Sequence, residues 1–247
     1  MTGGSKGIGG ALATRLASMG YHTVLNYYGA PAEKEMAEEL IAENHKKYGT
    51  EGIAVEADVS EFSNCQKIVE AAVNRFGSRI DVLVNNAGII KRQDAIEFTE
   101  ENWDSVIQVN QKMVFFLSQA FAKQLMKQGE GGKIINVCSM LSYQGGIRVP
   151  SYTASKSAII GLTRALANEW AKYNINVNGI APGYMATNNT AQLRDDADRS
   201  EAILDRIPAG RWGTPQDMEG AVIYLASKAS DYVNGFTLAV DGGWLAR

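Results

Sequence analysis

Tyr152 and Lys156, in the stretch SYTASK (151–156), have a spacing that could support proton transfer. Residues four apart on a helix lie on one face with adjacent side chains. A free tyrosine is a poor base at neutral pH because its pKa is about 10, but a neighbouring ammonium group favours the phenolate and should lower that pKa. Ser139 ends a predicted strand and could hydrogen-bond the substrate oxygen whose proton Tyr152 exchanges. The three residues therefore predict general acid–base chemistry at an oxygen atom.

The stretch TGGSKGIG (2–9) could hold a phosphate group. Gly3, Gly7 and Gly9 permit a sharp turn, a close approach of backbone N–H groups to a pyrophosphate, and tight packing of the helix that follows. Glycine clusters also form ordinary turns, and a Tyr–Lys pair on a helix is often only a surface feature. The conjunction of both motifs with Ser139 is what predicts a dinucleotide-dependent site.

Apolar segments alternate with helical patterns along almost the whole chain, and these elements must position the two motifs. Such strands, separated by helices, indicate a parallel sheet covered on both faces. The sequence therefore predicts a single α/β domain over 1–247 with a doubly wound, Rossmann-like fold. The polar segment 184–213 follows a strand and is expected to form a lid or binding loop. Predicted strands cover 21–28, 52–59, 80–88, 132–139, 175–183 and 236–243. Predicted helices cover 32–49, 102–128, 150–173 and 215–226. One further helix is predicted to begin near Ile8, and another, which follows the strand 52–59, is predicted to end near Phe76.

The composition argues against several classes of function. A formal net charge of −3 and a pI near 5.5 do not suit a nucleic-acid-binding surface, which is normally basic. No run of 18 apolar residues is present, so we expect no membrane span. Cys65 and Cys138 lie far apart, and we expect two reduced, buried thiols in a cytoplasmic protein. Because the only histidines are His22 and His45, we expect no metal site.

The chain resembles the short-chain dehydrogenase/reductase family over essentially its full length. The resemblance rests on TGGSKGIG (2–9), NNAG (85–88), Asn110, Ser139, Tyr152-x-x-x-Lys156 and PGYMAT (182–187). It implies hydride transfer between NAD(P) and a secondary alcohol or ketone, with Asn110, Ser139, Tyr152 and Lys156 as catalytic residues, and it implies a homotetramer. The cofactor-binding residues that it implies are Gly3, Ser5, Lys6, Gly7, Ile8, Gly9, Asn26, Asp58, Val59, Asn85, Ala87, Gly88, Tyr152, Lys156, Pro182, Gly183 and Thr187.

Within this family, residues 86–247 resemble dehydrogenases of sugar acids of the 2-dehydro-3-deoxy-D-gluconate and 2-deoxy-D-gluconate type, which generally use NAD. The implied partner is a small sugar acid, whose carboxylate and hydroxyl groups need a cation and polar donors. Arg148, four residues before Tyr152, is the candidate cation, although it could equally be a surface charge. The expected substrate-binding residues are Ser139, Gln144, Arg148, Tyr152, Tyr184, Asn188 and Asn189.

The N-terminal third is closer to the 3-oxoacyl-acyl-carrier-protein reductases, which use NADPH, so an acyl thioester is the alternative substrate. Sites that prefer NAD place an acidic residue about 20 residues after the glycine loop to bind the ribose 2′-hydroxyl. Here LNYYG (25–29) offers Asn26 and no acid before Glu33, while Lys6 could pair with a 2′-phosphate or be a solvated loop charge. These residues favour NADP(H), whereas the family resemblance favours NAD.

The glycine loop follows Met1 directly, whereas members of the resembling family carry a central strand before it. We expect the fold to lack this first strand, and we hypothesise that a valine codon was taken as the start. Its loss would leave backbone groups of two neighbouring strands unpaired, at roughly 1–3 kcal/mol for each buried group. A catalytically silent scaffold is therefore the non-enzyme alternative, although the complete set of four catalytic residues argues against it.

Overall fold

The computed structural model describes residues 1–247 and contains six strands and nine α-helices. The strands are β1 (Thr23–Tyr27), β2 (Gly52–Glu56), β3 (Val82–Asn85), β4 (Gly132–Val137), β5 (Ile175–Pro182) and β6 (Thr237–Val240). The helices are α1 (Gly7–Ser18), α2 (Pro31–Tyr48), α3 (Phe62–Phe76), α4 (Glu100–Ile107), α5 (Met113–Gln128), α6 (Pro150–Trp170), α7 (Ala191–Asp195), α8 (Ala197–Leu204) and α9 (Glu219–Ala226). The predicted α/β class is confirmed.

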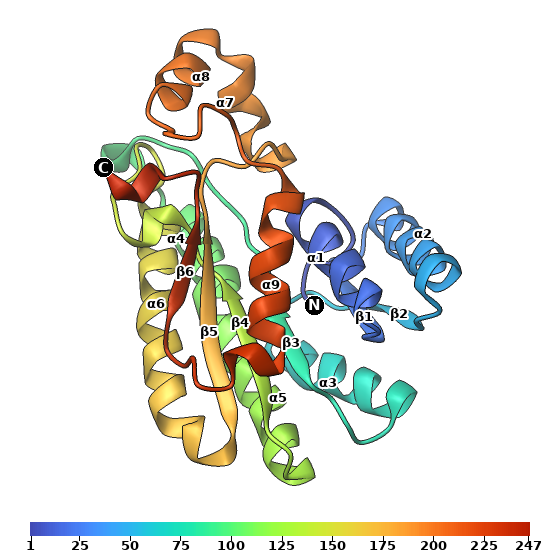
Figure 1. Ribbon diagram of the computed structural model, residues 1–247. Coiled ribbons are helices and arrows are strands. Elements are labelled where there is room, and N and C mark those ends of the chain that lie inside the picture. Colours follow the sequence, from blue (N-terminus) through green and yellow to red (C-terminus); the bar gives the residue numbers. More distant parts are fainter.

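All strand pairs are parallel, and the sheet has two parts, β1–β2 and β3–β4–β5–β6 in spatial order. The start of the chain lies between them (Figure 1). On one side, the Met1 ammonium donates to the Val24 carbonyl at 2.9 Å, and the Asn26 N–H donates to the Met1 carbonyl at 3.0 Å. On the other side, the Thr2 N–H donates to the Val84 carbonyl at 3.1 Å. No full strand lies here, as expected, and these first residues connect the two parts.

Helices cover both faces of the sheet, with α1, α2 and α9 on one face and α3, α4, α5 and α6 on the other (Figure 1). The apolar pattern of β4 explains this arrangement. Ile134 belongs to the core cluster with Leu125 of α5, whereas Ile135 belongs to the cluster with Leu225 of α9. A strand buried on both faces needs apolar residues at successive positions, because neighbouring side chains point to opposite faces.

Three predicted segments differ from the structure in detail. The predicted helix 102–128 is divided into α4 and α5 by a π-helical turn, Gln108–Lys112. The predicted irregular segment 184–213 contains α7 and α8, which project beyond the carboxyl edge of the sheet (Figure 1). The predicted helix 215–226 begins with a 3₁₀ turn, Pro215–Met218, before α9. No helix combines the length and apolar character that crossing a membrane requires.

Candidate active site

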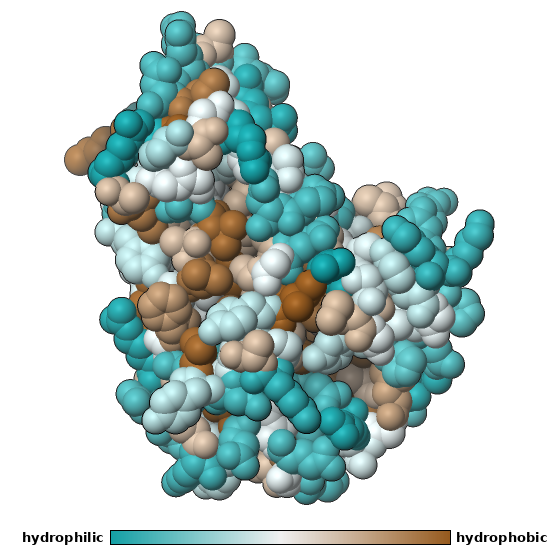
Figure 2. Space-filling view, viewed as in Figure 1, coloured by the Kyte–Doolittle hydropathy of each residue, from teal (hydrophilic) through white to brown (hydrophobic).

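A cleft of about 1400 Å³ lies at the carboxyl ends of the strands. Ligands of open parallel sheets bind at this edge, because the loops that leave the strands converge there. The cleft runs from the glycine loop and α2, past Ser139 and Tyr152, to the segment that precedes α7. In Figure 2 the surface is notched between the part formed by α7 and α8 and the part formed by α2. A cleft of this volume can hold both a dinucleotide and a small substrate.

Ser139, Tyr152 and Lys156 line the cleft together. Ser139 directly follows Cys138 after β4 and caps a short 3₁₀ turn, where its Oγ accepts from the Leu141 N–H at 3.1 Å. Tyr152 and Lys156 lie in the first two turns of α6, and the Lys156 Nζ is 5.7 Å from the centroid of the Tyr152 ring. The spacing of four residues thus places both side chains on one face of the helix, as the sequence predicts.

Burial controls the protonation of this group. It raises the pKa of Tyr152 above its ordinary value, and the hydrogen bond with Ser139 and the positive charge of Arg92 oppose that rise. Burial also lowers the pKa of Lys156 from 10.5 to about 8, while its Nζ donates to the Val137 carbonyl at 2.6 Å. The prediction that Lys156 lowers the pKa of Tyr152 is therefore wrong: desolvation dominates, and Arg92 is the cation that opposes it.

Asn110 lies in the π-helical turn, is fully buried, and holds the segment that follows β3. Its Oδ1 accepts from the Ile89 N–H at 2.8 Å, and its Nδ2 donates to the Ile89 carbonyl at 2.9 Å and to the Ser155 Oγ at 3.3 Å. A Cβ placed on Gly88 would lie 3.3 Å from Asn110 Oδ1 and 3.7 Å from Lys156 Nζ. Asn110 therefore positions the backbone beside Lys156. The extra residue in the π-helical turn points the Asn110 side chain from this turn toward the backbone of Ile89 in the loop after β3.

The glycine loop has the shape of a phosphate cradle. Gly3 and Gly7 have φ values of 58° and 56°, in the left-handed region that favours glycine. A Cβ on Gly9 would lie 2.1 Å from the Gly3 carbonyl oxygen, whereas a Cβ on Gly7 would meet nothing within 4 Å. The loop is therefore closed toward the protein and open toward the cleft. Because α1 begins at Gly7, its free N–H groups and positive dipole end fit the pyrophosphate of a nicotinamide dinucleotide.

The end of the cleft that lies beside the glycine loop and α2 contains one ion pair. Lys6 Nζ lies 2.7 Å from Glu33 Oε1, and Glu33 Oε2 accepts from the Tyr28 N–H at 3.2 Å. Asn26, a predicted cofactor-binding residue, also lines the cleft, but its side-chain amide donates to backbone carbonyls, the nearest being that of Ala57 at 2.7 Å. The charged groups Lys6 and Glu33, rather than the Asn26 amide, are thus available at this end.

Comparisons with known proteins agree with this geometry. The family profile described as Enoyl-(Acyl carrier protein) reductase matches residues 3–245. The chain is 61% identical over 247 residues to the 2-dehydro-3-deoxy-D-gluconate 5-dehydrogenase of Dickeya dadantii, covering 100% of this chain and 94% of that relative. The chain belongs to the short-chain dehydrogenase/reductase family. Members of this family use a nicotinamide cofactor, so the chain is an NAD(P)-dependent oxidoreductase.

Two further members of the family are similar over the whole chain. The 5-keto-D-gluconate 5-reductase of Escherichia coli (strain K12) is 43% identical over 245 residues, which cover 99% of this chain and 94% of that relative. The structure of a gluconate 5-dehydrogenase from Burkholderia cenocepacia, in complex with NADP and tartrate, has a TM-score of 0.92 and 39% identity, and covers 100% of this chain and 94% of that one. The similarity includes the N-terminal third, which the sequence associates with acyl-carrier-protein reductases.

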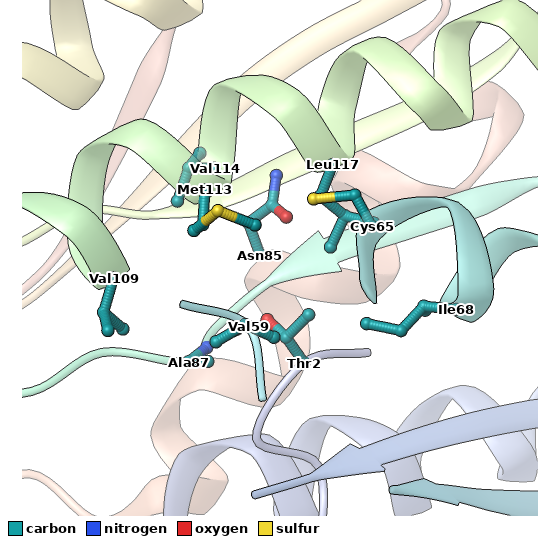
Figure 3. A pocket seen from close by; sticks show the side chains of 10 residues that line it. All are labelled: Thr2, Val59, Cys65, Ile68, Asn85, Ala87, Val109, Met113, Val114 and Leu117. Carbon is teal, nitrogen blue, oxygen red and sulfur yellow. Dashed lines mark hydrogen bonds between the residues drawn. The ribbon is translucent and has the colours of Figure 1, made fainter. Parts of the chain in front are cut away.

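The structure places every family-implied cofactor residue along the cleft except Asn85. Asn85 is buried, and its Nδ2 donates to Ser118 Oγ at 3.0 Å and to Asn136 Oδ1 at 2.8 Å. Asn85 lines a cavity of about 10 Å³. Figure 3 shows its side chain near Met113 and Leu117. Asn85 therefore connects β3 to β4 and α5 and does not line the cleft, and its expected role in cofactor binding stays a prediction.

Three predicted substrate-binding residues also lie outside the residues that line the cleft. The Arg148 side chain is 60% exposed, and its Nε pairs with Asp94 Oδ1 at 2.8 Å. Gln144 accepts from Arg206 at 3.2 Å, and Tyr184 packs against two tryptophan rings. Arg148 thus forms an ion pair at the surface, which favours the alternative of a surface charge over a cation for a carboxylate.

Arg92 is a second cation near this end of the cleft, although it is not one of the lining residues. Its guanidinium donates to the Asn189 carbonyl at 2.8 Å, and its charge acts on both Tyr152 and Tyr184. Asn188 and Asn189 line the cleft beside it, as expected. The sequence carried a usable signal, because Arg92 lies four residues after NNAG, in the loop at the carboxyl end of β3.

Proposed function

We propose that the chain interconverts a hydroxyl and a keto group on a sugar acid of the 2-dehydro-3-deoxy-D-gluconate type. The observation that carries this proposal is a proton-transfer group, Ser139, Tyr152 and Lys156, in a dinucleotide-sized cleft, with a cation, Arg92, that lies behind the lining residues and donates to the Asn189 carbonyl on the cleft wall. Two similar proteins, the 2-dehydro-3-deoxy-D-gluconate 5-dehydrogenase of Dickeya dadantii and the 5-keto-D-gluconate 5-reductase of Escherichia coli, support the substrate class.

The residues of this chain would perform the proton transfer. When bound, the nicotinamide dinucleotide supplies or accepts the hydride. Tyr152 exchanges the proton at the substrate oxygen through its phenolic Oη, and Ser139 hydrogen-bonds the same oxygen through Oγ. Lys156, whose pKa is about 8, can exchange protons near neutral pH. Asn110 fixes the backbone of Ile89 and keeps Gly88 beside Lys156.

The cofactor would lie along the row of cleft residues that begins at the glycine loop. Its pyrophosphate would meet the N-terminus of α1, and its adenosine would extend toward Asp58 and Lys6. The nicotinamide would lie beside Tyr152 and Lys156, with Thr187 on the opposite wall. Bound NADP in the Burkholderia structure supports a cleft that accepts the phosphorylated nucleotide, and Lys6 is the cation for its 2′-phosphate.

Arg92 would hold the carboxylate of the sugar acid. A guanidinium can bind a carboxylate with two parallel hydrogen bonds, which fixes the orientation of the substrate as well as adding affinity. The backbone carbonyl of Asn189 is its partner in the structure, so one edge of the guanidinium is already oriented. Asn188 and Asn189 offer amide groups to the hydroxyls.

A steady-state assay with matched arginine variants tests this function. We expect turnover of 2-dehydro-3-deoxy-D-gluconate or 2-deoxy-D-gluconate, lost in Tyr152→Phe, and little or none with acetoacetyl thioesters. Arg92→Gln should raise KM by about 10- to 100-fold, since a charge-assisted hydrogen bond contributes roughly 1.5–3 kcal/mol. Arg148→Gln is the control and should change KM by less than about threefold, because its ion pair is exposed. Turnover of the thioester alone would refute the proposal and favour the acyl-carrier-protein reductase alternative.

We also propose that the chain forms a homotetramer. The support is the exposed edge of the sheet at β6, where Phe236 and Tyr143 are 58% and 48% exposed and the Tyr143 hydroxyl contacts the Thr237 carbonyl. An open strand edge with exposed aromatic rings is suited to covering by a second copy. Light scattering after size-exclusion chromatography should give four times the mass of 26.7 kDa.

A further inference from the structure

The Lys6–Glu33 pair joins the first turns of two helices at the adenosine end of the cleft. Lys6 is the N-cap residue of α1, and Glu33 lies in the first turn of α2. Their side chains meet at 2.7 Å, and the second carboxylate oxygen of Glu33 accepts from the Tyr28 N–H at the end of β1. Glu33 therefore reaches back to the end of the strand, five residues before it.

Lys6 is the sole cation available to a phosphate in this region. Among the residues that line the cleft, Lys6 and Lys156 are the only ones with a permanent or titratable positive charge, and Lys156 lies at the nicotinamide end beside Tyr152. The neighbouring Lys34 on α2 faces Glu38, with the two charged groups 3.8 Å apart. A 2′-phosphate would consequently depend on Lys6 alone for charge neutralisation.

The two nucleotides make different demands on the pair. NAD carries an uncharged ribose diol, which can donate a hydroxyl hydrogen to the Glu33 carboxylate while the pair stays intact. NADP carries a dianionic phosphate, so Lys6 would have to leave Glu33 to reach it. The Lys6 and Glu33 side chains are 50% and 22% exposed, which leaves both free to rearrange. Direct repulsion between Glu33 and the phosphate is weakened by solvent and salt, so the competition for Lys6 should dominate.

We propose that Glu33 sets the nucleotide preference by competing with the ribose 2′-phosphate for Lys6. The inference rests on the proposed nucleotide orientation, with the adenosine toward Lys6. Glu33 thereby reduces the affinity for NADP and makes the chain able to use both nucleotides. The acid that recognises the ribose is thus supplied from the first turn of α2 and not from the end of β1, where the sequence offers Asn26, Tyr27 and Tyr28.

Calorimetric titration of the full chain with NADPH and with NADH tests the proposal without an activity readout. Glu33→Gln keeps the size of the side chain and one acceptor oxygen, and it removes the negative charge. We expect this variant to bind NADPH about fivefold more tightly and to change the affinity for NADH less than about twofold. Lys6→Met should weaken NADPH binding about tenfold and leave NADH binding nearly unchanged. Glu35→Gln, on the exposed face of α2 and outside the cleft, is the charge-matched control and should change neither.

The double variant separates competition from direct repulsion. In the Lys6→Met background there is no cation to release, so adding Glu33→Gln should leave NADPH affinity within about twofold of Lys6→Met alone. A full fivefold gain in that background, or no gain from Glu33→Gln in the natural chain, would overturn the proposal. Binding of neither nucleotide would overturn both this inference and the proposed function. If both nucleotides bind but no sugar acid is turned over, the substrate proposal fails and the Glu33 comparison still decides this inference.

Discussion

Replacing Asn110 with leucine should destabilise the fold more than most single substitutions at polar residues. Leucine has a similar size but cannot make the three hydrogen bonds of the Asn110 amide, two with the Ile89 backbone and one with Ser155. The N–H and carbonyl of Ile89 would lose their partners in a partly buried place. Each unsatisfied group costs about 1–3 kcal/mol, and partial access of water to Ile89 reduces the sum. We therefore expect a loss of about 2–4 kcal/mol in the free energy of unfolding.

The chain offers a matched control for this substitution. Asn44 on α2 is also buried, at 3% exposure, but its Nδ2 has no hydrogen-bond partner. Asn44→Leu should cost less than about 1 kcal/mol or stabilise the fold, because a buried unsatisfied donor is removed. Urea unfolding followed by circular dichroism at pH 7 gives both values, with the unfolding slope m checked for constancy. Equal losses for the two variants would refute the assignment of Asn110 as the residue that holds Ile89.

Two further predictions follow from buried titratable groups. Because burial lowers the pKa of Lys156 from 10.5 to about 8, the unfolded chain binds more protons than the folded chain between these values, and stability should rise with pH across this window. From pH 7.5 to 10.5, the unfolding free energy of the natural chain should rise relative to that of Lys156→Met by up to about 3 kcal/mol. Urea titrations at several pH values measure both free energies, and a difference that does not change with pH would contradict this prediction. Burial raises the pKa of both Cys65 and Cys138 to about 11, so iodoacetamide at pH 8 should label neither quickly until urea is added, as mass spectrometry would show.

The fold was predictable because its elements are apolar enough to require a parallel sheet covered on both sides. The runs around Ile134 and Ile175 give strands within a few residues of their observed bounds. The π-helical turn at Asn110 was not predictable from periodicity, because one inserted residue hardly changes an apolar pattern over 27 residues, 102–128. The short helices α7 and α8 are similarly hidden in a polar segment, since Asp196 caps α8 by a local hydrogen bond that composition alone does not indicate.

The candidate site was predictable where chemistry depends on spacing along one element, and not where it depends on partners from elsewhere. Tyr152 and Lys156 share a helix face, so four residues of sequence determine their proximity. Arg148 and Arg92 could be distinguished only by knowing that Asp94 neutralises the first and that the second reaches Asn189. The direction of the Tyr152 pKa shift likewise depends on burial by the whole cleft wall.

The glycine loop is held by side-chain contacts to the segment that follows β3. The Thr2 Oγ1 accepts from the N–H groups of Asn86 and Ala87, both at 3.0 Å. The Asn86 amide donates in return to the carbonyls of Thr2 and Gly3, again at 3.0 Å. These four hydrogen bonds fix the loop to the segment that follows β3.

The same segment, 86–89, also reaches the proton-transfer end of the cleft. Gly88 lies beside Lys156, and Ile89 is held by Asn110 from the π-helical turn. One stretch of four residues therefore contacts both ends of the cleft, and it is held at one end by Thr2 and at the other by Asn110. Asn110 therefore acts on the site through the backbone that it holds, although its side chain does not line the cleft.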